Sequence, residues 1–345
     1  MNFLPSRLVS KNPQFKARLG TWAAYLLALS ALVWVFKDVE WSSLVEQIQQ
    51  ISWPWVCAIL VFDILSFYVQ GVRWRYLLNP CGQITPKKTT QAIYVGLFSS
   101  EVLPLRAGEI IRGVLVSRWM GKNFRDVLPS MAVERLLDGL WFSASMAVVA
   151  LLVPIPGNIR TVTVGILAAA AVGMGLFAWN ARRIVKPQSD SETQSLSKIK
   201  AMLQDVTRGL QSIGFSRDFW AATAFSGLLH VVQALAFISV VEACGIDLPL
   251  LPTIAVFLIV QIGIAIPNAP ANVGTYQLFC VLGLTFFGVE KSSAAAVSVV
   301  AFAILTFPVL LIGALATLQA GLSLTGFRSQ LKGMTESGIA TETAS

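Results

Sequence analysis

The chain has 345 residues, of which 55% are apolar and only 13% are charged, and its mean hydropathy is +0.68. A soluble domain has about 25% charged residues, so most of the surface of this chain faces a medium other than water. The net charge of +8 comes from basic residues that lie between apolar stretches, which indicates anionic lipid headgroups as partners and not nucleic acid. This composition excludes a soluble enzyme and a nucleic-acid-binding domain.

Metal and thiol chemistry have almost no support in the sequence. The four cysteines are far apart and form no CxxC pair, and the single histidine, His230, lies inside an apolar run. The chain also has no Walker A loop, no HExxH motif and no GxSxG motif. We therefore expect no metal, no other cofactor and no conventional hydrolase or ATPase activity.

The predicted elements begin with a basic cytoplasmic tail over residues 1–19. A helix needs roughly 20 mostly apolar residues to cross a bilayer core of about 30 Å. Six stretches meet this requirement, at about 20–36, 51–71, 129–153, 161–179, 218–241 and 294–320. The predicted fold class is an all-α polytopic membrane protein, with its transmembrane domain over residues 20–320.

Two further apolar regions are interrupted. Residues 91–103 and residues 253–266 each stop at a proline, and apolar sequence resumes after a short Pro- and Gly-rich break. The predicted structural breaks are Pro104 and Gly108 in the first region, and Pro267 and Pro270 in the second. An apolar segment, a break and a second apolar segment are typical of a broken helix or a re-entrant hairpin.

The distribution of Lys and Arg predicts the orientation of the chain, because cytoplasmic loops carry an excess of these residues. Basic residues predominate in 1–19, 72–90, 118–128 and 180–217, whereas acidic residues predominate in 37–50 and 242–251. Both chain ends are therefore predicted to be cytoplasmic.

This orientation gives two units of the same plan. Residues 51–153 are interpreted as span, hairpin from inside, span, and residues 218–320 as span, hairpin from outside, span. Inverted repeats with discontinuous helices recur in secondary transporters. The alternative is that all four half-segments are ordinary spans, which also returns the chain to its starting side. We favour the hairpins because residues 91–103 are short and Glu101 lies near their end.

Two polar segments complete the layout. Residues 180–217 are interpreted as a cytosolic linker followed by an amphipathic helix on the membrane surface. Residues 321–345 are predicted to be a disordered cytoplasmic tail.

Charged side chains inside membrane segments cost at least about 2.5 kcal/mol each on insertion scales, so they are candidates for a functional site. Six of them fall in two consecutive elements: Arg106, Glu109, Arg112, Glu134, Arg135 and Asp138. One interpretation is a set of structural ion pairs that hold the first hairpin against the next span. Another is a polar chamber where an arginine binds a phosphate through its planar fork and a carboxylate takes a proton. Both roles can coexist.

The second break carries no charge. Asn268 and Asn272 supply amide groups, Gly274 permits the close approach of another chain segment, and Tyr276 continues the polar stripe. This neutral tip either completes a headgroup site or only packs against the charged one.

Two other polar pairs have mainly structural interpretations. Asp63 and Gln70 form a polar face on the second span, and His230 and Gln233 are interpreted as an interhelical hydrogen-bonding pair.

The motif residues resemble a known family. The stretch LPLRAGEIIRGVLVSRWMGKNFRDVLPSMAVERLLDGLWF, residues 103–142, resembles the signature of flippase-like membrane proteins of bacteria and archaea. The later IPNAPANVGTYQ, residues 266–277, resembles the second Pro- and Gly-rich segment of that family. The family includes the transmembrane half of the lysylphosphatidylglycerol synthases, and the resemblance covers roughly residues 15–320.

The resemblance implies a lipid-translocating protein of the bacterial plasma membrane. It carries onto Pro104, Arg106, Gly108, Glu109, Arg112, Glu134, Arg135, Asp138, Pro267, Pro270 and Gly274. The chain departs from the family where a glycine pair and a glutamate are usual, at Ala271, Asn272 and Gln277. About 25 residues follow the last predicted span, so we expect no aminoacyl-transferring domain and no lysyl transfer by this chain.

The expected function is therefore that of a flippase, which moves an anionic, phosphate-bearing or glycosyl lipid headgroup between leaflets. Two alternatives stay open. The first is a membrane-embedded enzyme that acts on a lipid-linked substrate, and the second is a non-catalytic partner of a glycosyltransferase or lipid synthase.

Overall fold

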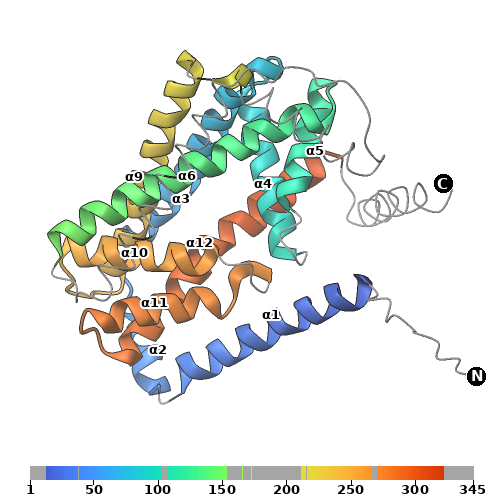
Figure 1. The fold of residues 1–345 in the computed structure, drawn as a ribbon. Helices are drawn as coiled ribbons and strands as arrows, with labels where there is room; N and C mark the ends of the chain where they lie inside the picture. The colour runs from blue at the N-terminus through green and yellow to red at the C-terminus, as the bar shows by residue number, and fades with distance from the viewer. Residues whose placement is uncertain are drawn as a thin grey trace, which may run out of the picture.

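The computed structural model describes residues 13–37, 39–102, 108–153, 211–214, 216–265 and 270–321, together with the single positions 165 and 172. Within these residues every regular element is a helix (Figure 1). The predicted all-α class is thus confirmed for the described part of the chain. The predicted span 161–179, most of the loop 180–217 and nearly all of the tail 321–345 lie outside it.

Four of the described helices are long and apolar enough to cross a membrane. They are α3 (Trp53–Leu78, continued by the 3-10 helix η1, Asn79–Cys81), α6 (Phe124–Leu152), α9 (Arg217–Ala243) and α12 (Lys291–Gln319). They coincide with the predicted spans 51–71, 129–153, 218–241 and 294–320. The largest difference in boundary is at α3, which continues seven residues beyond residue 71 because its last two turns are buried against other helices.

The N-terminal region contains two helices. α1 (Pro13–Phe36) covers the predicted first span, and its segment Tyr25–Phe36 is apolar but shorter than a span. α2 (Trp41–Gln49) was not predicted, since the sequence favoured an outside loop over residues 37–50. Two contacts hold α2 in place: Phe36 stacks on Trp41, and Gln47 donates a hydrogen bond of 2.6 Å to Ser293 at the start of α12.

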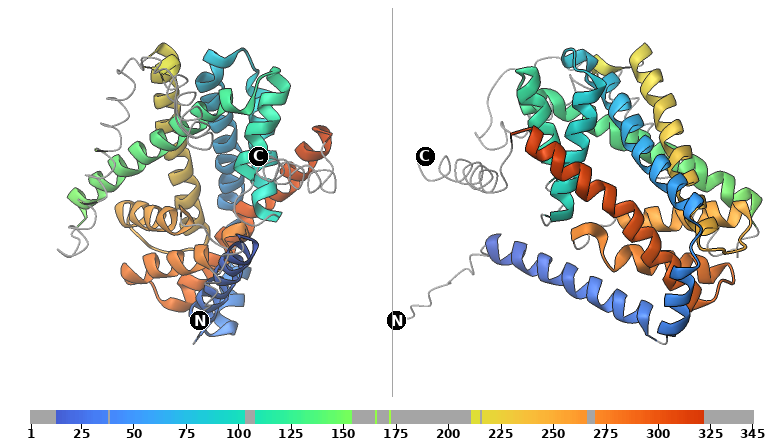
Figure 2. Two further views of the ribbon diagram at one scale, coloured as in Figure 1. Left: turned by 45° about the vertical axis from the view of Figure 1, so that its right-hand side comes forward. Right: turned by 180° about the vertical axis from the view of Figure 1, so that it is seen from behind.

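The two interrupted regions form two pairs of adjacent helices. α4 (Pro86–Val102) packs against α5 (Gly108–Met120), and α10 (Leu250–Ala265) packs against α11 (Thr275–Phe286) (Figures 1 and 2). The predicted breaks fall between the two helices of each pair. The first pair is especially close, because a Cβ atom at Gly108 would overlap the carbonyl oxygen of Gly96.

The broken ends of the two pairs meet. The 3-10 helix η3 (Pro270–Asn272), which lies between α10 and α11, contacts α4. α12 contacts both α4 and α11, and it runs past both pairs in the rear view of Figure 2. Segments that are about 170 residues apart in the sequence are therefore neighbours in the fold.

The buried apolar side chains form two clusters. One lies mainly between α9, α10, α11 and α12, and the other mainly between α3, α4, α5 and α6. α3 contributes to both, through Ile59 to the first cluster and through Trp74 to the second. The polar residues of α3 between these two positions lie between two apolar cores.

Candidate functional site

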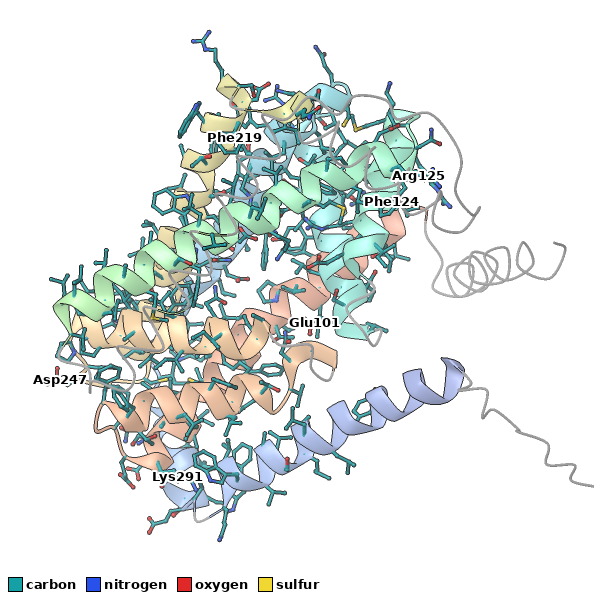
Figure 3. The ribbon with its side chains drawn as sticks, viewed as in Figure 1. Glu101, Phe124, Arg125, Phe219, Asp247 and Lys291 are labelled. Atoms are coloured by element: carbon teal, nitrogen blue, oxygen red, sulfur yellow. The ribbon has the colours of Figure 1, made fainter. Side chains whose placement is uncertain are left out.

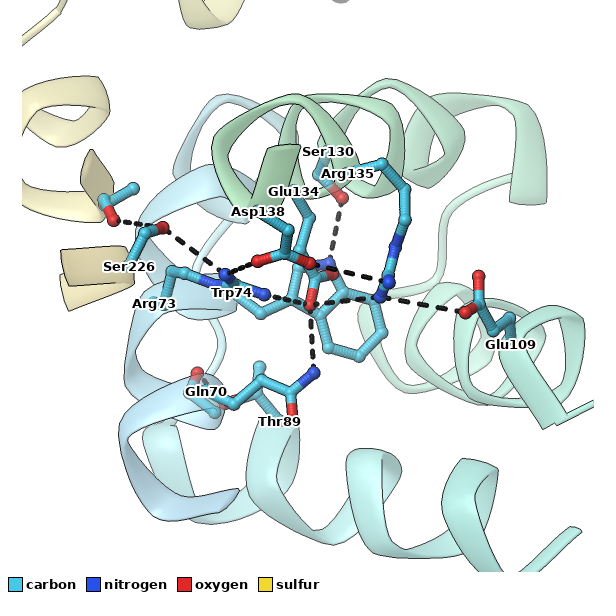
Figure 4. A network of polar contacts seen from close by, with 12 residues as sticks. Gln70, Arg73, Trp74, Thr89, Glu109, Ser130, Glu134, Arg135, Asp138 and Ser226 are labelled. Carbon is cyan, nitrogen blue, oxygen red and sulfur yellow. Dashed lines mark hydrogen bonds and ion pairs between the residues drawn. The ribbon is translucent and has the colours of Figure 1, made fainter. Parts of the chain in front are cut away.

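Glu134, on α6, lies at the centre of the predicted charged group. Its side chain is 0% exposed, and its Oε1 lies 2.6 Å from Nη2 of Arg73. Its Oε2 lies 3.0 Å from Nη2 of Arg112. Gln70 donates a hydrogen bond of 3.2 Å to Oε1 (Figure 4). One carboxylate thus joins α3, α5 and α6.

Arg73 was not among the predicted site residues, because the sequence placed it in a cytoplasmic loop. The structure corrects this: Arg73 is a helical residue of α3 whose side chain is 0% exposed. Its guanidinium group donates to Asp138 on α6 and, at 3.3 Å, to Ser226 on α9. It is therefore the residue that connects α9 to the charged group.

A signal for Arg73 was present in the sequence. Polar residues follow one face of α3 at intervals of three and four: Asp63, Ser66, Gln70 and Arg73. This spacing marks a continuous stripe along a helix. Extending the polar face of Asp63 and Gln70 by one turn would have included Arg73.

Arg135 and Glu109 form the outer edge of the charged group. Their side chains are 51% and 41% exposed, and Nη2 of Arg135 lies 3.7 Å from Oε1 of Glu109. The other side of the Arg135 guanidinium lies 3.5 Å from Oδ2 of Asp138. Exposed ion pairs of this kind contribute about 0–1 kcal/mol in water, so the buried members dominate the energetics.

We call Arg73, Arg112, Glu134, Asp138, Arg135 and Glu109 the ion cluster. Three positive charges face three negative ones, so the described members of the cluster balance. The guanidinium of Arg112 also lies over the ring of Trp74, 4.7 Å from its centroid, and the Trp74 Nε1 donates to Ser130 at 3.0 Å. This geometry favours structural ion pairs. Phosphate binding by Arg106, Arg112 or Arg135 stays a prediction.

A partly open cavity of about 250 Å³ lies elsewhere in the bundle, and we call it the central cavity. Its described lining comes from α3, α4, α9, α10, η3, α11 and α12. The chemically distinctive polar residues of this lining are Asp63, Glu101, Gln233, Gln261, Asn272 and Tyr276. The described wall also contains four phenylalanines: Phe67, Phe237, Phe257 and Phe302. The described lining contains no Lys, no Arg and no member of the ion cluster.

Both broken ends contribute to the central cavity. Glu101 belongs to the last turn of α4, and Figure 3 shows it beside the end of the α10–α11 pair. Asn272 of η3 and Tyr276 of α11 lie in the same lining. Asn272 and Tyr276, two predicted residues of the second break, thus line the same cavity as Glu101, which lies just before the first break.

The backbone of the second break adopts left-handed conformations. Ala271 has a φ of 60° and Asn272 a φ of 54°, a region that costs residues with a Cβ roughly 1–2 kcal/mol. Gly274 has a φ of 83°, and a Cβ there would overlap the carbonyl oxygen of Ala28 in α1. The predicted close approach at Gly274 is thus present, and the approaching segment is α1. The Gln277 side chain accepts a hydrogen bond of 2.7 Å from the Gly274 N–H, and so an amide caps α11.

The remaining predicted residues are only partly described. Gly108 is the first residue of α5, and Pro270 is the first residue of η3. Pro104, Arg106, Pro267 and Asn268 lie outside the described residues.

Comparison with known protein families identifies the family of this chain. Residues 21–313 match the family described as the lysylphosphatidylglycerol synthase TM region, and this match includes both helix pairs and the ion cluster. The chain belongs to that family. It is thus a membrane protein of a lipid-related family with several apolar helices.

One curated relative is a distant match. The glycosyltransferase AglD of Haloferax volcanii is 23% identical over 354 residues, which cover 91% of this chain and 56% of the relative. The chain thus spans little more than half the length of this relative.

Proposed function

We propose that this chain moves the polar headgroup of a membrane lipid between the two leaflets, and that the headgroup passes through the central cavity. The observation that carries the proposal is the meeting of the two broken ends at this cavity. α4 contributes Leu97 and Glu101 to the lining, and η3 contributes Ala271 and Asn272. Secondary transporters place their substrate sites between discontinuous helices in this manner.

The depth of the cavity supports the same proposal. Asp63 lies ten residues after Trp53, the first residue of α3. A helix rises about 1.5 Å per residue, so this distance is about 15 Å, half the thickness of a bilayer core of about 30 Å. Polar side chains at the midplane are costly in contact with lipid tails, and a partly open chamber removes that contact.

The proposal includes a definite placement in the membrane. Both helix pairs are re-entrant, six spans cross the bilayer, and the basic loops and both termini face the cytoplasm of a bacterial cell. The ion cluster connects α3, α5, α6 and α9 to one another and holds these helices in place. The substrate is a lipid with a phosphate-bearing or glycosyl headgroup.

A cavity-filling variant tests this proposal. Ala236 of α9 is buried in the lining, whereas Leu235, its neighbour on the same helix, is exposed on the apolar surface. Ala236→Phe places a ring inside the cavity, and Leu235→Phe adds a similar ring outside it. The protein is reconstituted into vesicles of phosphatidylethanolamine and phosphatidylglycerol that contain a trace of fluorescent phosphatidylglycerol or fluorescent glucosyl diacylglycerol.

The readout is the fraction of fluorescent lipid that becomes accessible to a membrane-impermeant quencher. We expect the wild type and Leu235→Phe to expose inner-leaflet lipid, and Ala236→Phe to behave like protein-free vesicles. Equal accessibility in wild-type and protein-free vesicles for both lipids would refute the proposal. If a correctly folded Ala236→Phe variant moves lipid as fast as the wild type, the headgroup does not pass through the central cavity.

The name of the curated relative gives a reason to test a second candidate. The relative is described as a glycosyltransferase, and this chain covers 56% of it. An enzyme acting on a lipid-linked sugar would form a new lipid when the purified protein is incubated with lipid extract and nucleotide sugars. A non-catalytic partner would instead co-purify with a glycosyltransferase or synthase. Mass spectrometry of the lipids and of the purified complex distinguishes both from transport.

A further inference from the structure

Asp63 carries a buried carboxyl group that is not part of the ion cluster. The residue is 6% exposed, and it lies on α3 in the lining of the central cavity. Its Oδ2 atom is enclosed and has no hydrogen-bond partner. Its backbone carbonyl is better satisfied, because it accepts a hydrogen bond of 2.7 Å from the Ser66 hydroxyl.

Among the described residues, the lining around Asp63 supplies no compensating positive charge. Among the described titratable groups, Tyr94 on α4 and Tyr276 on α11 interact electrostatically with Asp63. The hydroxyl groups of both tyrosines are enclosed and also have no hydrogen-bond partner. A second acid, Glu101, lines the same cavity.

The other helices around this cavity also contribute no Lys and no Arg to its described lining. Gln233 of α9, Gln261 of α10 and Thr306 of α12 face the cavity and are uncharged. On α6, the acids Glu134 and Asp138 face Arg73 in the ion cluster. His230 of α9 lies edge-on to the ring of Phe257 and is not in the cavity lining.

A carboxylate in such a place cannot stay charged and unpaired. An isolated ion transferred to apolar surroundings costs so much that it takes up a proton or binds a cation instead. No group of three or more His, Cys, Asp or Glu side chains in the described residues could hold a metal ion. A proton needs no ligand other than the enclosed Oδ2 atom, so it fits this geometry without any further group.

The acids of the ion cluster are poor candidates for the same role. Glu134 is within 3.0 Å of the guanidinium groups of both Arg73 and Arg112, and these positive neighbours favour its carboxylate form. The sequence had suggested Glu109, Glu134 or Asp138 for a coupling proton. The contacts disfavour that role for Glu134.

We propose that Asp63 is the proton-binding residue of this protein. It holds a proton while its carboxyl group is enclosed, as in this structure, and releases it when water reaches that group from one side of the membrane. Movement of the headgroup is thereby coupled to movement of a proton. The coupling rests on the proposed function, whereas proton binding by Asp63 can be measured without any transport.

The first test is infrared difference spectroscopy of the full chain in nanodiscs of phosphatidylethanolamine and phosphatidylglycerol. We expect the wild type at neutral pH to show the carbonyl stretch of a protonated carboxyl group, and Asp63→Asn to lose it. Glu46→Gln, which changes an exposed acid of α2, is the matched control and should keep the band. A band that is equal in the wild type and in Asp63→Asn, or absent from the wild type, would overturn the proposal.

The second test applies a gradient of two pH units across proteoliposomes, a 100-fold ratio of proton activity that is worth about 2.7 kcal/mol per proton. With the fluorescent lipids named above, we expect the wild type to distribute them unequally between the leaflets, and the inequality to reverse with the gradient. Asp63→Asn should distribute them equally under either gradient.

These outcomes separate the two proposals. A wild type that moves lipid without responding to the gradient, or an Asp63→Asn variant that responds like the wild type, would overturn the coupling alone. A wild type that moves neither fluorescent lipid would refute the proposed function for those lipids. The infrared band would then decide by itself whether Asp63 binds a proton.

Discussion

The ion cluster and the central cavity both bury acidic side chains inside the helical bundle, but they surround these acids in opposite ways. Glu134 has two guanidinium groups and an amide within hydrogen-bonding distance. Asp63 has a carboxyl oxygen without a partner and no basic residue in the described lining around it. The contrast separates an acid whose charge stabilises the fold from an acid that we propose to exchange a proton.

The two helix pairs also differ in what lies at their broken ends. At Gly108, the absence of a side chain lets α5 approach Gly96 of α4 closely, and the two helices form a tight pair. At Ala271 and Asn272, the chain instead adopts left-handed conformations beside a cavity. Strained backbone of this kind clusters at binding sites and switch regions, which agrees with the site proposed at the central cavity.

The largest expected effect comes from the ion cluster. Arg73→Met leaves the buried Glu134 with one fewer partner and should lower the free energy of unfolding by about 3–5 kcal/mol. Arg75→Met is the control, because Arg75 lies two residues on in α3 and its guanidinium carbon lies over the Tyr76 ring, 5.5 Å from the ring centroid. Denaturation of the reconstituted protein measures both. Equal losses in the two variants would mean that the buried ion pairs do not stabilise the fold.

A smaller effect is expected where α4 and α5 touch. Gly108→Ala forces the two helices apart and should cost about 1–3 kcal/mol, the usual range for overpacking. Gly139→Ala is a matched change in the middle of α6, where a Cβ meets nothing within 4 Å, and it should stabilise the protein by up to about 1 kcal/mol through helix propensity. A neutral Gly108→Ala would contradict the tight pairing.

Gly274 at the second break and Gly288 after α11 have similar backbone conformations. Gly274 has a φ of 83° and Gly288 a φ of 86°, but only Gly274 has a neighbour within reach of a Cβ, namely Ala28. Both alanine variants lose about 1–2 kcal/mol from the left-handed conformation. Gly274→Ala should lose further stability, measured in the same assay, because it also displaces α1. Equal losses would show that α1 does not pack on the break.

The smallest effect is expected for Asp63→Asn. A neutral amide replaces a carboxyl group that we propose to be protonated, so the free energy of unfolding should change by less than about 0.5 kcal/mol. Glu134→Gln, which removes a charge from the ion cluster, is the comparison and should be clearly destabilising. A loss at Asp63 as large as that at Glu134 would show that Asp63 has a charged partner.

Much of the fold could be read from the sequence because its signals are local. Long apolar runs predicted α3, α6, α9 and α12, and proline with glycine predicted both breaks. α2 was missed, since nine residues with acidic neighbours resemble a loop unless the contacts with α12 are known. The position of η3 against α4 depends on packing between distant segments, which no local pattern contains.

The site was predictable in part for the same reason. The sequence identified Arg112, Glu134 and Asp138 as intramembrane charges, and the structure brings them together. It missed Arg73, because a basic residue near the end of a span also fits a cytoplasmic loop. Asp63 was noticed only as part of a polar face, since its lack of a partner is a property of the surrounding helices.

A reversible cross-link between the two broken ends tests the central claim most directly. Leu97 of α4 and Ala271 of η3 line the same cavity, so cysteines at both positions can be joined by a reducible thiol cross-linker. The background is a functional variant without the native cysteines Cys57, Cys81, Cys244 and Cys280. We predict that cross-linking stops headgroup movement in the double variant, that reduction restores it, and that each single variant is unaffected. Undiminished movement in the fully cross-linked protein would contradict a path through the central cavity.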